Sequence, residues 1–128
     1  MDFTDLETMK QAVVAALEDI KAKDITVLDV SKLTSMADYM IIASADSNRQ
    51  TRALSSNVQE KLRECGMPPI GVEGEENGEW VLVDFGAVVV HIMQPAVREY
   101  YSLEELWGGS RPAGAKLRHS PVGAIAHA

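Results

Sequence analysis

The chain has 128 residues, of which 46% are apolar and 24% are charged, and this composition is typical of one globular domain with its own core. Residues 109–128 hold three basic and no acidic residues, so residues 1–108 carry 9 basic and 19 acidic residues, a net charge of −10. A body this acidic repels phosphate backbones, which argues against direct nucleic-acid binding. It would attract a basic protein partner, but charge alone fits equally well a protein whose net charge only keeps it in solution.

The first part of the chain predicts a helix followed by two strands. Thr4 and Glu7 have the spacing of a helix capping box, and apolar residues then recur at helical spacing as far as Ile20. The β-branched run ITVLDV, residues 25–30, is typical of a strand. The run YMIIASA, residues 39–45, is apolar almost throughout, which indicates a central strand covered on both faces.

A second helix and a Gly-rich turn follow. Ser47 and Gln50 form another capping box, and Gly66 is the expected end of that helix. After the acidic turn GVEGEENGEW and two strands, Pro95 suits the first turn of a short helix, and a further short helix follows it. We interpret residues 1–108 as one domain and residues 109–128 as a flexible tail rich in Gly, Pro and Ala.

This order of elements predicts the fold class. Helix, strand, strand, helix, an optional strand, two strands and helix together indicate an α/β two-layer sandwich. We expect a mixed sheet of about five strands, with the helices mainly on one face.

The stretch EWVLVDFGAVVVHIMQP, residues 79–95, predicts a β-hairpin with two largely apolar faces. With Gly86 and Ala87 at the centre of a type II′ turn, counting outward pairs the two strands. One face is uniformly apolar and suits the helices; it comprises Val81, Val83, Phe85, Val88, Val90 and Ile92. The other face is mixed, and it comprises Trp80, Leu82, Asp84, Val89, His91 and Met93.

The mixed face has two interpretations. Aromatic and Met residues are enriched in protein interfaces, where a Trp is a typical hot spot. Alternatively, a C-terminal helix or a second copy of the chain covers this face, and Trp80 is part of the core. Periodicity alone slightly favours the second interpretation, and a one-residue slip in the turn would exchange the two faces.

Patterns for catalysis and metal binding are weak. GVEGEENG, residues 71–78, has three glycines, but its glutamates would repel a phosphate and it fits neither a P-loop nor a dinucleotide fingerprint. The three histidines lack metal-ligand spacing, and Cys65 has no neighbouring base. The stretch IIASADSNRQ lies where nucleotidyltransferases place a turn before a helix. Those enzymes need a pair of carboxylates to hold two metal ions, and here Asp84 has no second carboxylate beside it on the strand. These patterns argue against an enzyme and against a metal or cofactor.

Three features of the sequence indicate the cellular compartment. No run of about 18 uncharged apolar residues is present, so we expect no membrane span. The N-terminal stretch MDFTDLETMK has acids where a signal peptide has basic residues. A lone cysteine fits a reducing environment. We therefore expect a cytoplasmic protein.

Three segments resemble the ribosomal silencing factor family, RsfS or Iojap: ADYMIIASADSNRQ, then GVEGEENGEWVLVDFGAVVVHIMQPAVREYY, then LEELWG. The resemblance covers residues 4–108. It implies a nucleotidyltransferase-like fold without the catalytic carboxylates. It also implies a translation repressor that binds the basic large-subunit ribosomal protein uL14 and sterically blocks subunit joining under nutrient limitation, with organellar relatives linked to large-subunit biogenesis. Self-association as a homodimer off the ribosome is implied as well.

The mixed face then becomes the candidate site for uL14. The candidate protein-binding residues are Trp80, Leu82, Asp84, His91, Met93, Tyr39 and Tyr100. We expect the indole to be the anchor, Asp84 to accept hydrogen bonds from Lys or Arg of the partner, and His91 to orient it. The tyrosines, Tyr101 included, fit the core equally well. This hypothesis requires that the chain's own helices leave the mixed face uncovered.

Two alternatives remain at this point. One is a metal-dependent nucleotidyltransferase, which the missing carboxylate disfavours. The other is a homodimeric interaction module whose hairpin face meets only a second copy of itself and does not bind the ribosome.

Overall fold

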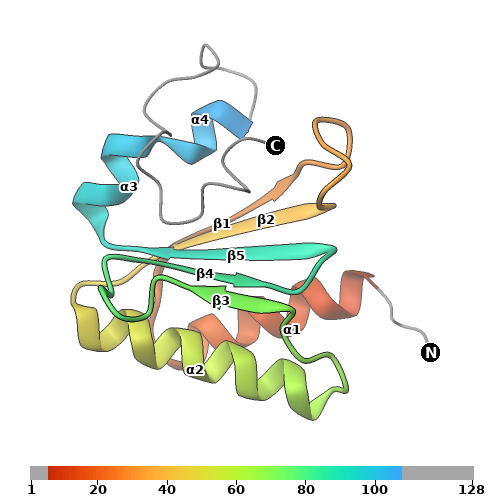
Figure 1. Cartoon of the computed structure of the whole chain (residues 1–128), viewed down its shortest axis with the longest axis horizontal. Helices are drawn as coiled ribbons and strands as arrows, with labels where there is room; N and C mark the ends of the chain where they lie inside the picture. Colours follow the sequence, from red (N-terminus) through yellow and green to blue (C-terminus); the bar gives the residue numbers. More distant parts are fainter. Residues whose placement is uncertain (1–5, 108–128) are drawn as a thin grey trace.

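The structure is a computed structural model that describes residues 6–107 (Figure 1). Its elements are α1 (Leu6–Asp19), β1 (Lys23–Asp29), β2 (Tyr39–Ser44), α2 (Asn48–Glu64), β3 (Gly71–Glu73), β4 (Trp80–Asp84), β5 (Val88–Met93), α3 (Pro95–Tyr101) and α4 (Leu103–Trp107). No helix within the described range is long and apolar enough to cross a membrane. The predicted cap at Thr4 and the predicted tail at residues 109–128 lie outside the described residues.

The strands form one mixed sheet in the order β1-β2-β5-β4-β3. Strands β2 and β5 are parallel, and the other neighbours are antiparallel. The predicted α/β class and the predicted five-stranded mixed sheet are therefore confirmed.

The register predicted for the hairpin is also confirmed. Trp80 lies opposite Met93 and Leu82 opposite His91, as counting outward from the turn requires. Gly86, at the first central position of the turn, has a φ of +89°, which glycine adopts without a Cβ clash. The alternation of side chains across the two strands therefore follows from the turn.

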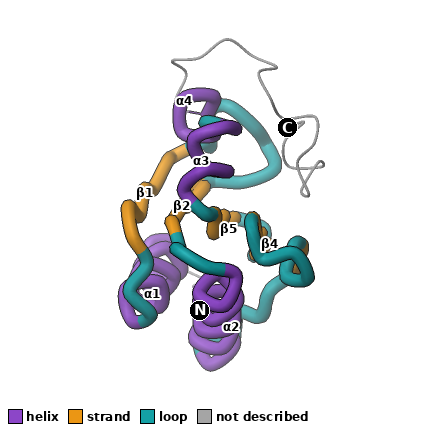
Figure 2. Tube along the Cα trace, turned by 90° about the vertical axis from the view of Figure 1, so that its left-hand side faces the viewer, coloured by secondary structure: helices purple, strands orange, loops and turns teal. Residues whose placement is uncertain are grey.

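Helices α1 and α2 cover one face of the sheet (Figure 2). Their apolar stripes meet the strand residues that point to this side, and all are buried. The helical contribution includes Val13, Leu17, Leu54, Val58 and Leu62, and the strand contribution includes Val81, Val83, Val90 and Ile92. The N-terminus of α2 is capped as predicted, because the Ser47 hydroxyl accepts a hydrogen bond from the backbone N–H of Gln50 at 3.1 Å.

The two short helices α3 and α4 cover the opposite face (Figures 1 and 2). A second buried cluster forms between them and the sheet, comprising Val30, Met40, Ile42, Trp80, Leu82, Val89, Met93, Leu103 and Trp107. Most of the helical length is on one face, as expected, but the other face is covered too. The central strands β2, β4 and β5 are therefore buried on both sides.

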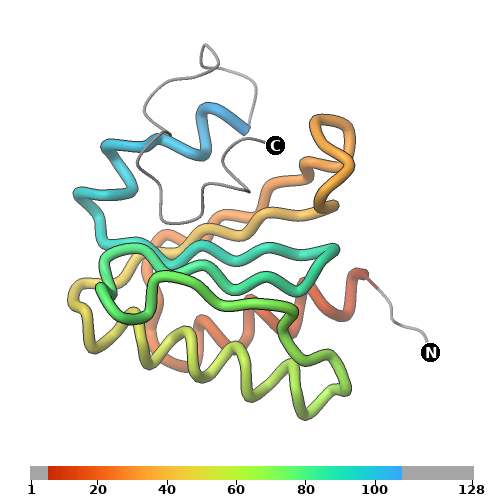
Figure 3. The backbone as a smooth tube through the Cα atoms, viewed as in Figure 1, coloured from red at the N-terminus to blue at the C-terminus, as the bar shows by residue number. Residues whose placement is uncertain are grey.

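The acidic turn between β3 and β4 is held against α2, and its path can be followed in Figure 3. Arg52 donates to the backbone carbonyls of Glu75 and Glu76 at 2.8 and 2.7 Å, and Thr51 donates to the carbonyl of Gly78 at 2.6 Å. Because α2 side chains satisfy three carbonyls of the turn, the turn has a defined position despite its glycines.

We predict that Gly74→Ala destabilises the protein by about 2 kcal/mol or more. Gly74 has a φ of +90°, and a Cβ there would lie 2.1 Å from the backbone oxygen of Trp80. Gly71→Ala is the matched control, because a Cβ at that position meets no atom within 4 Å. Urea unfolding followed by circular dichroism measures both variants, and equal stability of the two would contradict this close approach of the turn to β4.

Candidate functional site

The mixed face of the hairpin is not a surface in the folded chain. The exposed fractions of its predicted site residues are 3% for Trp80, 2% for Leu82, 1% for His91 and 0% for Met93. The expectation that the chain's own helices leave this face uncovered is therefore wrong. After Pro95 the chain turns back over the sheet, and α4 packs Leu103 and Trp107 onto the apolar side chains that β4 and β5 present. Apolar burial explains this arrangement, in which Trp80 is part of the core.

The structure does bring the predicted anchor and the predicted orienting residue together. The indole N–H of Trp80 donates to Nδ1 of His91 at 2.9 Å, and the ring of Tyr101 lies 4.8 Å from the indole. Burial lowers the pKa of His91 from 6.5 to about 3, so its ring is neutral at neutral pH. His91 lies diagonally across the strand pair from Trp80, a spacing that lets large side chains touch. In this conformation the pair stabilises the interior.

The other predicted site residues are accessible but lie apart. Tyr39 and Asp84 are half-buried at the end of the sheet that carries the hairpin turn, where Asp84 accepts a hydrogen bond from the backbone N–H of Gly86 at 2.7 Å. Tyr100 is 54% exposed on α3, which begins at the other end of the sheet, and its ring meets that of Tyr101 edge to face. No surface of the described chain joins all seven predicted residues.

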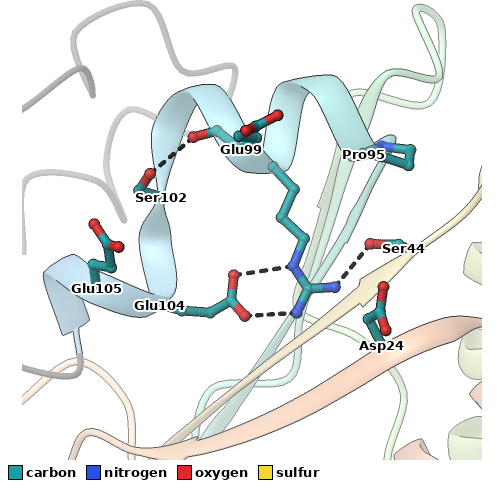
Figure 4. Close-up of a pocket in the computed structure, with 8 residues that line it drawn as sticks. Asp24, Ser44, Pro95, Glu99, Ser102, Glu104 and Glu105 are labelled. Carbon is teal, nitrogen blue, oxygen red and sulfur yellow. Dashed lines mark hydrogen bonds and ion pairs between the residues drawn. The ribbon is translucent and has the colours of Figure 1, made fainter.

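A cavity of about 370 Å³ lies where the parallel strands β2 and β5 end (Figure 4). The helices that follow these strands, α2 and α3, lie on opposite faces of the sheet. Such a switch point is where open α/β sheets form crevices. The residues that line the cavity are Asp24, Ser44, Pro95, Arg98, Glu99, Ser102, Glu104 and Glu105.

Arg98 lines this cavity and is only 9% exposed. Its guanidinium binds the Glu104 carboxylate through two hydrogen bonds of 3.0 and 2.7 Å, as Figure 4 shows. It also donates to the hydroxyls of Ser44 at 2.8 Å and Thr26 at 3.0 Å. The hydrogen bond from Arg98 holds the pKa of Glu104 below its usual value. One side chain therefore connects α3, α4, β1 and β2.

Sequence reasoning missed Arg98 and its cavity. The cluster combines residues from four elements that are as far apart in the chain as Asp24 and Glu105. The available signal was an arginine among apolar and aromatic residues in the short helix AVREYY, where a charge needs a partner. The identity of that partner depends on how α4 folds back, which periodicity does not specify.

The cavity is better suited to cations than to phosphates. Asp24, Glu99 and Glu105 line it in addition to the paired Glu104. Within residues 6–107, no group of three or more His, Cys, Asp or Glu side chains could hold a metal ion.

The two parts of a nucleotidyltransferase site are also separated. Ser44 lies at the Met93 end of the sheet, whereas Asp84 lies at the Val89 end. The turn before α2 and the carboxylate that would have to meet there are therefore at opposite ends of the sheet. This geometry disfavours the nucleotidyltransferase alternative.

The family model described as "Ribosomal silencing factor during starvation" matches residues 4–125. The chain is 53% identical over 121 residues to the ribosomal silencing factor RsfS of Chromobacterium violaceum, a match that covers 94% of this chain and 99% of that protein. It is 39% identical over 94 residues to RsfS of Bacillus subtilis, covering 73% of this chain and 80% of that protein. A crystal structure of a C. violaceum protein, 54% identical, superposes with a TM-score of 0.81 over 91% of this chain and 98% of that one.

We predict that Trp80→Ala destabilises the fold by about 3–5 kcal/mol, because it leaves a large cavity in the second core cluster. Trp80→Phe keeps an aromatic ring but removes the N–H that donates a hydrogen bond to His91. We expect this substitution to lower the free energy of unfolding by about 1–3 kcal/mol. Urea unfolding followed by far-ultraviolet circular dichroism measures both. A fully stable Trp80→Ala variant would show that the indole is not enclosed.

The ion pair between Glu104 and Arg98 predicts how the stability of the fold changes at acid pH. Its pKa lies below the ordinary 4.5 in the folded chain, so the pairing with Arg98 stabilises the fold above about pH 4.5 and is lost as the pH falls through the folded pKa. We expect the unfolding free energy of the wild-type protein to fall more steeply between pH 6 and pH 3 than that of Glu104→Gln. Parallel pH profiles for the two proteins would rule out this contribution.

Proposed function

Because the chain belongs to the ribosomal silencing factor family, RsfS, we propose that it represses translation by binding the large ribosomal subunit and sterically blocking the small subunit. The observation that carries the proposal is the match of the family model to residues 4–125, together with 53% identity over almost the full length of a bacterial RsfS. Membership of this family makes the chain a ribosome regulator and not an enzyme.

The proposed docking partner is uL14, a basic protein of the large subunit. The charge of the chain supports this choice, because residues 1–108 carry a net charge of −10. Opposite charge accelerates encounter and rejects unsuitable partners more than it adds affinity. An acidic body is poorly suited to ribosomal RNA but well suited to a basic protein on the ribosome.

The proposed contact surface includes the outer side of α3 and the adjacent rim of the cavity. Tyr100 is the exposed aromatic of the predicted set, and Glu99 precedes it on the same helix. Glu99, Asp24 and Glu105 line the cavity beside this helix and provide negative charge for Lys or Arg of uL14. Asp84 and Tyr39 are proposed to contribute less, because they lie at the opposite end of the sheet.

We also propose where the protein acts, under which conditions, and in which oligomeric state. We place the protein in the cytoplasm, repressing translation when nutrients are limiting, and we expect a homodimer when the large subunit is absent. A role in large-subunit biogenesis is compatible with the same docking surface. Analytical ultracentrifugation of the isolated chain tests the dimer independently of ribosome binding.

The central test is co-sedimentation with purified large subunits, followed by addition of small subunits. We expect the wild-type protein to sediment with the large subunit and to reduce the fraction of joined ribosomes. Failure to co-sediment, or binding without any effect on joining, would overturn the proposed function.

The contact surface is tested with charge reversal. We expect Glu99→Lys to weaken large-subunit binding about tenfold, which corresponds to about 1.4 kcal/mol. Glu60→Lys is the matched control, because Glu60 is exposed on α2, which covers the opposite face of the sheet. Equal binding by both variants and the wild type would eliminate the α3 surface while leaving the silencing activity in place.

A further inference from the structure

The segment that covers the mixed face consists of two very short helices. Helix α3 has 7 residues and α4 has 5, and helices of this length are not stable by themselves in water. Ser102 joins them in the left-handed conformation, with φ 52° and ψ 48°, which costs a non-glycine residue about 1 kcal/mol. The position of the segment therefore depends on its contacts with the sheet.

Arg98 provides the polar part of those contacts. From α3 it reaches Ser44 on β2 and Thr26 on β1, and it binds Glu104 on α4 through two hydrogen bonds. This guanidinium therefore holds the two helices to each other and both of them to the sheet (Figure 4). Charge-assisted bidentate pairs of this kind are among the stronger hydrogen-bonded contacts in proteins.

Two buried nitrogens, one on the sheet and one on the segment itself, favour opening of the segment. Nε2 of His91 and Nε1 of Trp107 are buried and have no hydrogen-bond partner within the described part of the chain. Since Nδ1 of His91 accepts from Trp80, the proton of the neutral ring is on Nε2, so both nitrogens are donors. A buried donor without a partner costs about 1–3 kcal/mol. Opening the segment would expose both donors to water and remove this cost.

The rest of the fold also has a core and hydrogen bonds that do not involve the segment. Strands β2, β4 and β5 contribute to the separate core on the α1 and α2 side. Their backbone pairing runs along the whole of β2 and β5. The β3–β4 turn is bound by Thr51 and Arg52 of α2. A sheet with one covered face and an intact hydrogen-bond ladder can therefore act as a separate unit of local stability.

We propose that Pro95–Trp107 is a latched cover that opens as one unit from a sheet that stays folded, with the Arg98 guanidinium as its latch. Opening exposes the mixed face, including Trp80, Leu82 and Met93. The cover is thus a conformational device that controls whether a large apolar surface is presented to solvent. It is a property of the isolated chain, so it stands or falls separately from ribosome binding.

Two readouts follow this opening directly. Both tryptophans of the chain, Trp80 on β4 and Trp107 at the end of the cover, lie in the cluster between the cover and the sheet, so quenching of tryptophan fluorescence by acrylamide reports on that contact. Hydrogen exchange of the α3 and α4 amides, including those of Ser102 and Leu106, reports on the cover itself. In the wild-type protein we expect these amides to exchange at least tenfold faster than the central amides of β2 and β5.

Three variants test the latch. Arg98→Met removes the guanidinium, and Glu104→Gln removes the charge of its partner while keeping the shape of the side chain. We expect both to accelerate exchange of the cover amides about 10- to 100-fold and to raise the acrylamide quenching constant at least twofold, with unchanged exchange in β2 and β5. Lys23→Met is the matched control, because it breaks an ion pair with Asp46 in which both side chains are exposed. This control should change neither readout.

Two results of these exchange measurements would overturn the proposal. If the cover amides and the central strand amides accelerate by the same factor, the cover and the sheet form one cooperative unit and the proposal is overturned. It is equally overturned if neither Glu104→Gln nor Arg98→Met changes exchange in residues 95–107. Should Arg98→Met fail to fold, the milder Glu104→Gln and the wild-type exchange pattern decide the question.

Discussion

Strands β2, β4 and β5 carry apolar side chains on both faces, so the sheet must be covered twice. The two long amphipathic helices cover one face, and the two short helices α3 and α4 cover the other. This constraint explains why Trp80 is interior and why Arg98 enters a partly buried position. A charge so placed needs a carboxylate and hydroxyls around it, which Glu104, Ser44 and Thr26 provide.

The buried clusters on the two faces of the sheet differ in the kinds of contact that stabilise them. Beneath α1 and α2 the contacts are almost entirely apolar, and both helices are long enough to present a continuous stripe. Beneath α3 and α4, apolar packing is combined with a buried histidine, two indoles and one ion pair. Polar groups inside a core are directional, so this side is sensitive to the loss of one partner in a way that the first core is not.

The fold alone does not identify the function of this chain. A turn between a central strand and a capped helix is present, yet Asp84 lies at the other end of the sheet and caps a backbone N–H of the hairpin turn. Acidic side chains line the crevice at the carboxyl ends of β2 and β5, and this charge supports the proposed binding of a basic partner. The sheet by itself would support several functions.

Features that depend on neighbouring residues can be predicted from the order of amino acids alone. The hairpin register follows from the Gly86 turn and a side-chain period of two, and the start of α2 follows from the Ser47 cap. The folded chain was needed to show which side of the hairpin α3 and α4 cover, and which residues surround Arg98. Alternation along a strand shows that two faces are apolar but does not show what covers each. That choice depends on the direction the chain takes after Pro95, which is set by packing between residues far apart in the sequence.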